Sequence, residues 1–326
     1  MAAKRIFVTL RIAEPALKRL SAAAQVDLWS GEASPPHDEL LSCIADADAI
    51  LSMLADRLDA ATIAAAPRLS VISNYAVGFD NIDLGAATER GIAVGHTPGV
   101  LTETTADLAF ALLMAAARRV VEGDRYVREG RWRAWRPEVL LGRDLFGATL
   151  GIIGFGAIGQ AMARRGIGFR MRVLYTSPSP QKGVAAQRVG LEELLRESDF
   201  VSIHVPLTAE TRHMLGVPEF ALMKPGAIVI NAARGAVIDQ KALAASIRSG
   251  HLGGAGLDVT DPEPIEPGDP LLELPNVVIT PHIGSASHAT RLKMAEMAVD
   301  NILDVFAGRL PRFCANPGVK LRRISE

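Results

Sequence analysis

Cysteine is almost absent from this sequence: Cys43 and Cys314 are the only two among 326 residues. They lie far apart and form no C-x-x-C motif, which excludes a disulfide framework and a thioredoxin-like redox site. So few cysteines fit a reducing cytoplasm, and we expect both to be small buried side chains. Most histidines have no metal-ligand spacing with cysteine or aspartate, so we predict no metal site; these are His96, His204, His213, His251 and His288.

Long apolar runs are also missing. No stretch of ~18 apolar residues is free of charges or runs of glycine, which excludes a membrane-spanning helix. The first ten residues include two basic side chains but no apolar segment or cleavage site behind them, so we expect no signal peptide and a cytoplasmic protein. The formal net charge is only −1, which gives no reason to expect a nucleic-acid or membrane partner.

Apolar residues make up 49% of the sequence, over a length that suffices for two domains. In the first hundred residues, short apolar segments alternate with helical ones, which predicts βαβ units and a parallel sheet. The expected strands are residues 6–10, 26–29, 49–54, 69–73 and 92–94, and the expected helices start at Glu14 or span 37–45 and 60–66. No glycine-rich loop follows the first strand, so we expect this part not to hold a cofactor.

A glycine-rich turn organises the second half of the chain. A short apolar run is followed by three glycines spaced G-x-G-x-x-G and then by a helix. Gly154 permits a tight turn, Gly156 lets a pyrophosphate approach the backbone, and Gly159 lets the helix lie close to the strand. The helix is expected from Ile158 to about Gly168, and its free N–H groups and partial positive charge favour phosphate. Ala157 and Ile158 are therefore expected to contact the cofactor as well. The sequence therefore predicts a dinucleotide-binding loop.

After this loop the alternation resumes and predicts a doubly wound dinucleotide-binding domain. Its expected strands are residues 149–153, 172–177, 200–205, 227–231, 254–259 and 277–280, with helices notably at 191–197 and 239–249. The segment from Ser287 to Ala307 is an amphipathic helix that we expect to cross back to the first domain. The predicted division is a discontinuous substrate-binding domain, residues 1–99 plus 288–326, and a dinucleotide-binding and dimerisation domain, residues 100–287.

Two segments precede the glycine-rich loop. Residues Leu101 to Arg119 form an expected helix that is apolar nearly all round, which predicts burial between domains or between subunits. Residues Tyr126 to Arg143 are rich in arginine, contain Trp132 and Trp135, and are poorly periodic, so we expect an extended arm. This arm is either a surface loop or a subunit contact.

Three ionisable side chains, Arg234, Glu263 and His282, follow expected strands of the second domain. Ligands of open α/β sheets bind beyond the carboxyl ends of the strands, so all three are expected at the edge that carries the glycine-rich loop. An arginine can hold a carboxylate by two parallel hydrogen bonds. A histidine can give a proton to a carbonyl oxygen, and a carboxylate on its other ring nitrogen fixes the tautomer. Each residue alone is explained as a loop or turn residue, but together they favour catalysis.

The segments around these residues resemble the catalytic signatures of the D-isomer-specific 2-hydroxyacid dehydrogenases. The segments are NAARGAVID at 231–239, GLDV at 256–259 with EP at 263–264, and PHIGS at 281–285. The segment NYAVGFDNID at 74–83 is similar to the substrate-domain loop of that family. The resemblance spans essentially the whole chain and, within the family, is greatest to the glyoxylate/hydroxypyruvate reductases.

This resemblance implies an α/β fold with two doubly wound parallel-sheet domains, a flavodoxin-like substrate domain and a Rossmann cofactor domain, with a cleft between them. It implies an NAD(P)H-dependent reductase of small 2-oxo acids, such as glyoxylate and hydroxypyruvate, that forms a homodimer through its cofactor domains. Arg234 would bind the substrate carboxylate, His282 would be the general acid/base, and Glu263 would be its partner.

The resemblance also assigns roles to further positions. The backbone of Val77 and Gly78 would add donors to the carboxylate, and Leu54 would border the pocket. A tryptophan of the neighbouring subunit often closes the pocket in the reductase subgroup; Trp135 is the candidate here, unless it only packs within the arm. Other residues would contact the cofactor: Ala232, Asp258 and Gly284 on the nicotinamide side, and Pro206 and Thr211 in the groove.

The strand after the glycine-rich loop bears on the choice of coenzyme. An NAD-specific site usually ends this strand with Asp or Glu, which accepts from the ribose 2′-OH. Here the strand ends near Ser177 without an acid, and Ser177, Ser179 and Lys182 could donate to a 2′-phosphate. The sequence thus favours NADPH, but Pro178 stands where related NADPH-preferring reductases commonly have arginine, so use of NADH stays open.

Two other functions stay open on sequence alone. Any small anion satisfies an arginine such as Arg234, so phosphoglycerate, phosphite or a bulkier 2-oxo acid could be the substrate. A co-repressor-like protein could also keep this fold to sense nucleotides without catalysis. The intact set of Arg234, Glu263 and His282 argues against that second alternative.

Overall fold

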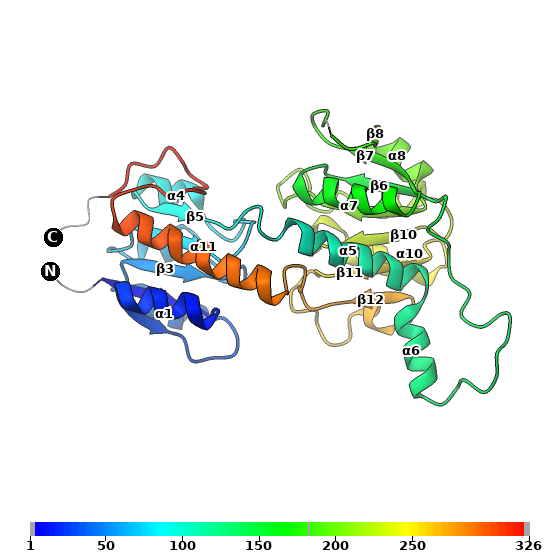
Figure 1. The fold of residues 1–326 in the computed structure, drawn as a ribbon, viewed down its shortest axis with the longest axis horizontal. Helices are drawn as coiled ribbons and strands as arrows, with labels where there is room; N and C mark the ends of the chain where they lie inside the picture. Colours follow the sequence, from blue (N-terminus) through cyan, green and yellow to red (C-terminus); the bar gives the residue numbers. More distant parts are fainter. Residues whose placement is uncertain (1–3, 182, 323–326) are drawn as a thin grey trace. The chain divides into compact units, whose positions relative to one another are not determined.

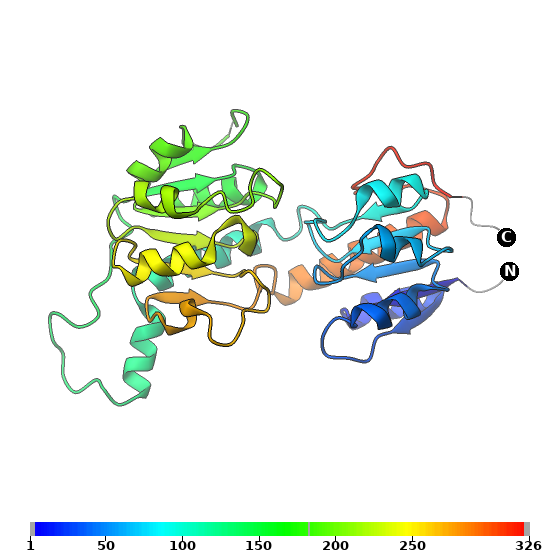
Figure 2. The same cartoon turned by 180° about the vertical axis from the view of Figure 1, so that it is seen from behind.

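The computed structural model describes residues 4–181 and 183–322, and the chain divides into two compact units. The first unit comprises the residues up to Leu101 and those from Ala286 onward, and the second runs from Thr102 to Ser285. The sequence predicts these divisions at 99/100 and 287/288. Each unit has one parallel sheet with helices on both faces (Figures 1 and 2). This confirms the predicted class of two doubly wound α/β domains.

The first unit has a five-stranded sheet in the order β2-β1-β3-β4-β5, with all neighbours parallel. Its strands are β1 (Arg5–Val8), β2 (Gln25–Leu28), β3 (Ala49–Ser52), β4 (Val71–Asn74) and β5 (Ala93–Gly95). Its helices are α1 (Glu14–Ala23), α2 (His37–Ile44), α3 (Ala60–Ala64), α4 (Leu84–Glu89) and α11 (His288–Phe306). The strand order is the flavodoxin-like one.

Helix α11 returns from the far end of the chain to pack on β3, β4 and β5 of the first unit. Polar groups fix it there: the Ser73 hydroxyl donates to the Ala298 carbonyl oxygen at 2.8 Å, and the buried Asn301 amide donates to the His96 carbonyl oxygen at 3.2 Å. A Cβ atom at Gly95 would lie only 2.6 Å from Cγ of Asn301, so the helix approaches the sheet because glycine occupies that position.

The second unit has a seven-stranded sheet in the order β12-β11-β10-β9-β6-β7-β8, again all parallel. Its strands are β6 (Thr149–Ile153), β7 (Arg172–Thr176), β8 (Gln187–Arg188), β9 (Phe200–Ile203), β10 (Ile228–Asn231), β11 (Gly254–Leu257) and β12 (Val277–Ile279). Its helices are α5 (Thr102–Ala117), α6 (Val120–Arg128), α7 (Ala157–Gly168), α8 (Leu191–Glu197), α9 (Val217–Leu222) and α10 (Gln240–Arg248), with 3-10 turns at Gly235–Val237 and Pro270–Glu273.

The strand order of the second unit reverses beside β6. From β6 the chain moves outward through β7 to β8, and then returns to β9 on the other side and continues through β10 and β11 to β12. Loops that leave β6 and β9 therefore diverge to opposite faces and open a crevice at their carboxyl ends, which is where open α/β sheets bind dinucleotides.

Three short elements were not expected from the sequence: α4, α6 and the two-residue strand β8. Several expected strands are also shorter; the strand predicted at 200–205 is β9, which ends at Ile203. The predicted extended arm, 126–143, begins within α6, and only the part after Arg128 is a loop. Helix α6 is amphipathic but has no buried residue, so its apolar face is not covered by the core of this unit.

The expectation that helix α5 lies between domains or between subunits is wrong for its buried face. Helix α5 packs on β10, β11 and α7 of its own unit, and most of its apolar side chains are buried there. Gly256 of β11 makes this possible, because a Cβ atom at that position would lie 2.9 Å from Cβ of Leu112. The apolar character of α5 therefore reflects close packing on a sheet.

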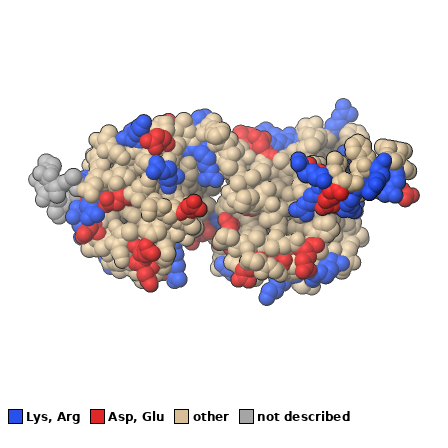
Figure 3. All heavy atoms as spheres, turned by 90° about the horizontal axis from the view of Figure 1, so that it is seen from below, with Lys and Arg blue, Asp and Glu red and all other residues tan. Residues whose placement is uncertain are grey.

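Charged side chains of both signs are interspersed on the face shown in Figure 3, with no extended patch of a single sign. Within the described part of the chain, no helix is both long enough and apolar enough to cross a bilayer.

A histidine packs directly beneath the turn that leaves β6. The N–H of His204 donates to the Ile153 carbonyl oxygen at 2.7 Å, and its Nε2 lies 2.8 Å from Oγ of Ser202. Burial lowers the pKa of the His204 imidazole to about 4. The ring is therefore neutral in the folded protein at neutral pH.

We predict that His204 makes the protein less stable in acid. The unfolded chain takes up the proton near pH 6.5 and the folded one only near pH 4, so stability is lost as the pH falls through this window. The full shift of pKa corresponds to about 3 kcal/mol, and less is expected because residue His204 keeps some exposed surface. Urea unfolding of His204→Gln between pH 7 and 4 should show a shallower decline. The exposed His37→Gln variant is the control, and equal slopes for both variants would contradict the prediction.

Candidate active site

The three glycines after β6 differ in their surroundings as the dinucleotide-binding turn requires. Gly154 has a φ of 89°, and a Cβ atom there would lie 2.5 Å from the His204 carbonyl oxygen. A Cβ atom at Gly159 would lie 2.2 Å from the Gly154 carbonyl oxygen, so glycine lets α7 lie against the turn. Gly156, just before α7, is exposed, and a Cβ atom there would meet nothing within 4 Å.

This turn fits the diphosphate of a dinucleotide. Gly156 leaves open space in front of the backbone, and Ala157 and Ile158 begin α7, whose first N–H groups have no partner within the helix. Helix α7 is long enough to place a partial positive charge at this end. The residues present therefore suit a nicotinamide dinucleotide, with its diphosphate at the start of α7.

His282 and Glu263 meet at the carboxyl edge of the same sheet. Nδ1 of His282 lies 2.5 Å from Oε1 of Glu263, and the two side chains are 30% and 42% exposed. His282 follows β12 and has a φ of 52°, an uncommon conformation for a residue with a side chain. With Nδ1 bound to the carboxylate, Nε2 is the nitrogen that can exchange a proton with a ligand.

The unusual backbone at His282 is held by Asp258, a buried residue that follows β11. The Asp258 carboxylate accepts hydrogen bonds from the N–H groups of Ile283 (2.8 Å) and Gly284 (2.7 Å) and from the Thr280 hydroxyl (2.6 Å). Its carbonyl oxygen accepts the N–H of His282 at 2.9 Å. One residue therefore fixes the whole turn from Thr280 to Gly284.

Arg234 leaves the next strand of the sheet, β10, and is partly buried. The Asn231 amide donates to the Arg234 carbonyl oxygen at 2.9 Å, and Nη1 of Arg234 donates to the Ala233 carbonyl oxygen at 2.8 Å. The turn after it needs glycine, because a Cβ atom at Gly235 would lie 1.9 Å from the Thr260 carbonyl oxygen. Arg234 thus follows β10 while Glu263 and His282 follow β11 and β12, on three adjacent strands.

The other residues predicted to contact the cofactor also lie past the carboxyl ends of strands. Ala232 follows β10 and is partly buried, and Gly284 lies in the turn held by Asp258. In the loop after β9, the Thr211 hydroxyl donates to the Pro206 carbonyl oxygen at 2.7 Å. The Asp258 carboxylate accepts from three protein donors, so its observed contacts are with the turn.

The loop after β7 contains Ser177 and Ser179, whereas Lys182 lies outside the described residues. The Ser177 hydroxyl donates to the Ser179 carbonyl oxygen at 2.5 Å. Arg188 of β8 also reaches this loop: Nε and Nη2 lie 3.2 and 3.0 Å from the Ser177 carbonyl oxygen. Arg188 belongs to no recognisable motif, so only the pairing of β8 with β7 identifies it.

Two loops of the first unit carry the predicted substrate-binding residues of that unit. Leu54 is partly buried after β3, and Val77 and Gly78 are partly buried after the neighbouring strand β4. The Asn74 amide donates to the Gly78 carbonyl oxygen at 2.8 Å, and the Asn81 amide donates to the Met53 carbonyl oxygen at 3.1 Å, which ties the two loops together. Among the described residues, the N–H groups of Val77 and Gly78 form no hydrogen bond.

Trp135 belongs to the loop that follows α6. This loop extends away from the sheet of the second unit (Figures 1 and 2). It is 82% exposed, and the nearby Trp132 is 63% exposed. Neither tryptophan is packed within the arm to any large extent.

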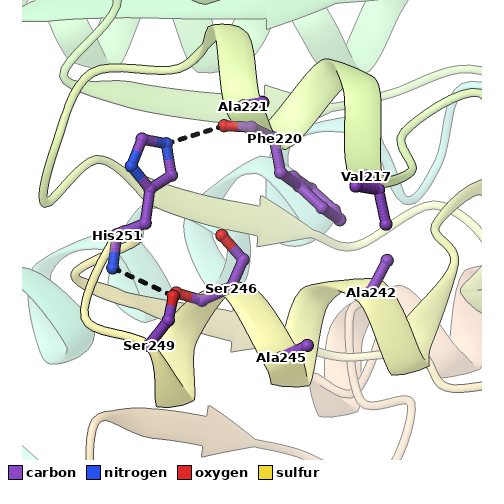
Figure 4. A pocket seen from close by; sticks show the side chains of 8 residues that line it. All are labelled: Val217, Phe220, Ala221, Ala242, Ala245, Ser246, Ser249 and His251. Atoms are coloured by element: carbon purple, nitrogen blue, oxygen red, sulfur yellow. Dashed lines mark hydrogen bonds between the residues drawn. The ribbon is translucent and has the colours of Figure 1, made fainter.

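Two pockets contain none of the predicted site residues, although the second borders the loops after β3 and β4. One, of about 360 Å³, lies between α9 and α10, where Nε2 of His251 bonds to the Phe220 carbonyl oxygen at 2.9 Å (Figure 4). The other, of about 420 Å³, borders Ala55 in the first unit and is lined by Asp59, Asp80 and Asp83. The described residues contain no cluster of three or more His, Cys, Asp or Glu side chains that could hold a metal ion.

Comparison with known proteins shows which family this chain belongs to. Residues 110–284 match the family described as D-isomer specific 2-hydroxyacid dehydrogenase, NAD binding domain. A glyoxylate reductase of Korarchaeum cryptofilum is 52% identical over 97% of this chain and 96% of its own length. A glyoxylate reductase of Pyrococcus furiosus is 47% identical over 98% and 97%.

Solved structures show the same fold. A protein from Thermus thermophilus superposes with a TM-score of 0.91 at 52% identity, over 95% of this chain and 99% of its own. An NADPH-dependent glyoxylate/hydroxypyruvate reductase from Sinorhizobium meliloti, in complex with NADP and malonate, superposes with a TM-score of 0.86 at 31% identity, over 99% of both chains. The chain therefore belongs to the D-isomer-specific 2-hydroxyacid dehydrogenase family and is an NAD(P)-dependent oxidoreductase.

Proposed function

We propose that this enzyme reduces small 2-oxo acids, chiefly glyoxylate and hydroxypyruvate, to 2-hydroxy acids, with NADPH favoured over NADH. The observation that carries the proposal is the 2.5 Å contact between His282, which follows β12, and Glu263, which follows β11, next to the strand β10 that precedes Arg234. An acid/base group and a carboxylate-binding group at one sheet edge match a substrate with a carbonyl beside a carboxylate. The names of the relatives, glyoxylate reductase among them, support the same substrate class.

The reaction adds a hydride to the carbonyl carbon and a proton to the carbonyl oxygen. The nicotinamide ring supplies the hydride when the coenzyme is bound. His282 is proposed to give the proton from Nε2, and Glu263 to hold Nδ1–H and stabilise the charged ring before transfer. In the reverse direction the neutral imidazole takes the proton from the hydroxyl group.

The substrate carboxylate is proposed to bind Arg234 through two parallel hydrogen bonds. The N–H groups of Val77 and Gly78, which have no partner among the described residues, are proposed as further donors to it, and Leu54 as an apolar contact. These donors orient the carbonyl group toward His282, and orientation is a large part of catalysis for so small a substrate.

The coenzyme is proposed to place its diphosphate at residues 154–159 and its nicotinamide near Ala232, Asp258 and Gly284. Pro206 and Thr211 would border it from the loop after β9. The preference for NADPH rests on the loop after β7, where Ser177 and Ser179 stand in place of a carboxylate, with Lys182 as a further candidate in the sequence. A carboxylate there would repel a 2′-phosphate.

The active form is proposed to be a homodimer joined through the second unit. Helix α6 and the loop after it expose a run of large apolar side chains, which a monomer in water rarely does without a partner; they are Val120, Val121, Val127, Trp132, Trp135 and Leu141. We propose that Trp135 contacts the substrate bound by the neighbouring subunit. This role would explain an aromatic ring that is 82% exposed in the single chain.

We predict that His282→Ala and Arg234→Ala impair the enzyme in different ways. Loss of the proton donor should lower kcat about 10²-fold or more, with little change in KM. Loss of the carboxylate-binding group should chiefly raise KM, because that contact is made before the reaction. Steady-state kinetics with glyoxylate, hydroxypyruvate, pyruvate and phenylpyruvate, each with NADPH and NADH, measure both effects.

If the His282→Ala variant kept a kcat close to that of the wild type, His282 would be excluded as the acid/base. An enzyme that binds NADPH but reduces none of the four acids would exclude the proposed function altogether. The exposed His37→Gln variant is the control for loss of a histidine outside the predicted site.

The proposed homodimer can be tested by its mass and by variants of the exposed apolar residues. Sedimentation should give twice the monomer mass of 34.7 kDa, and the double variant Val120→Asp, Val127→Asp should be monomeric because two carboxylates would be buried. Trp135→Ala should stay dimeric but raise KM for hydroxypyruvate. A wild-type monomer with full activity, or an unchanged KM in the Trp135→Ala dimer, would contradict this arrangement.

A further inference from the structure

Arg188 lies beside the loop that receives the adenosine ribose in this type of fold. Strand β8 pairs in parallel with β7, and this register places Arg188 opposite Tyr175. From there the guanidinium group reaches the loop after β7: Nε and Nη2 donate to the Ser177 carbonyl oxygen, and Nη2 also lies 3.0 Å from the Pro178 carbonyl oxygen.

The segment that forms this loop and β8 contains basic residues but no acidic ones. No Asp or Glu occurs in the sequence from Thr176 to Leu191, and the first acid after the strand is Glu192. The end of this strand is where the ribose 2′ position lies in dinucleotide-binding domains. A cation without a neighbouring carboxylate in this segment favours a ligand with an additional phosphate.

A guanidinium group can bond to the carbonyl groups of the loop and to an anion at the same time. It has five N–H donors in one plane, and among the described residues its bonds to the loop come from Nε and Nη2 and none comes from Nη1. The carbonyl contacts hold the group in place, so it loses little side-chain freedom when an anion arrives. Charge-assisted bonds from arginine to phosphate are among the stronger hydrogen bonds in proteins.

We propose that Arg188 binds the 2′-phosphate of NADPH and is the residue through which this enzyme distinguishes NADPH from NADH. The loop after β7 has Pro178 where an arginine could bind this phosphate. Arg188 supplies a guanidinium group from the neighbouring strand β8 instead. The assignment deepens the coenzyme preference stated under the proposed function and rests on it. Arg188 acts on binding alone and takes no part in the transfer of hydride or proton.

The test uses two probes that differ only in the 2′-phosphate, adenosine 2′,5′-bisphosphate and 5′-AMP. Titration calorimetry would give the Kd of each for the wild type, Arg188→Gln and Arg188→Lys. The matched control is Arg172→Gln, which removes an exposed arginine from the opposite end of β7, where it pairs with Glu197 at 2.6 Å.

We expect Arg188→Gln to raise the Kd of adenosine 2′,5′-bisphosphate about tenfold or more. The Kd of 5′-AMP should rise less than about threefold. Arg188→Lys should keep part of the discrimination, and Arg172→Gln should keep all of it. Thermal unfolding of each variant checks that the fold is intact, which the exposure of Arg188 makes the expected result.

An equal rise in the Kd of both probes in the Arg188→Gln variant would overturn the proposal, because Arg188 would then only hold the loop. Unchanged binding of both probes would overturn it as well. So would a wild type that binds the two probes equally, since no 2′-phosphate site would exist. Only equal binding of the two probes by the wild type would also remove the proposed preference for NADPH. The other two results concern Arg188 alone, and none of the three bears on the reduction of 2-oxo acids, which the kinetic assays test separately.

Discussion

The turn that carries His282 depends on one buried carboxylate. Asp258 accepts hydrogen bonds from Thr280, Ile283 and Gly284 through its side chain and from His282 through its carbonyl oxygen. An isolated buried charge would be costly, and these donors supply the compensation. In the turn held by these hydrogen bonds, His282 has a φ of 52° and its Nδ1 contacts Glu263. The proposed catalytic geometry therefore depends on a side chain whose own contacts are structural.

The second constraint is the parallel sheet. Because all seven strands of the second unit run the same way, every loop that follows a strand opens at one edge. The glycine-rich turn after β6, Arg234 after β10 and His282 after β12 lie far apart in sequence, yet they share that edge. The order reversal beside β6 adds the crevice for the dinucleotide. The parallel sheet therefore brings these residues to one edge, and the individual turns orient their side chains.

Much of this could be predicted from the sequence because strong local patterns coincide with strand ends. The spacing of Gly154, Gly156 and Gly159 predicts the turn, and the structure gives each glycine a separate steric reason. Two elements were not predicted: α6, which has an apolar face but no buried residue, and β8, which has only two residues. The apolar pattern of α5 predicted burial but not the partner, because packing on a sheet and packing on a subunit need the same side chains. Arg188 could not be predicted at all, since its role depends on pairing between β7 and β8.

The most direct test of the account is a crystal structure with NADP⁺ and oxamate, an unreactive analogue of a 2-oxo acid. We predict that the oxamate carboxylate forms two hydrogen bonds with Arg234 and that its amide carbonyl oxygen lies about 3 Å from Nε2 of His282. Nδ1 of His282 should remain bound to Glu263. Oxamate bound away from Arg234, or His282 turned so that Nε2 faces no ligand oxygen, would contradict the account.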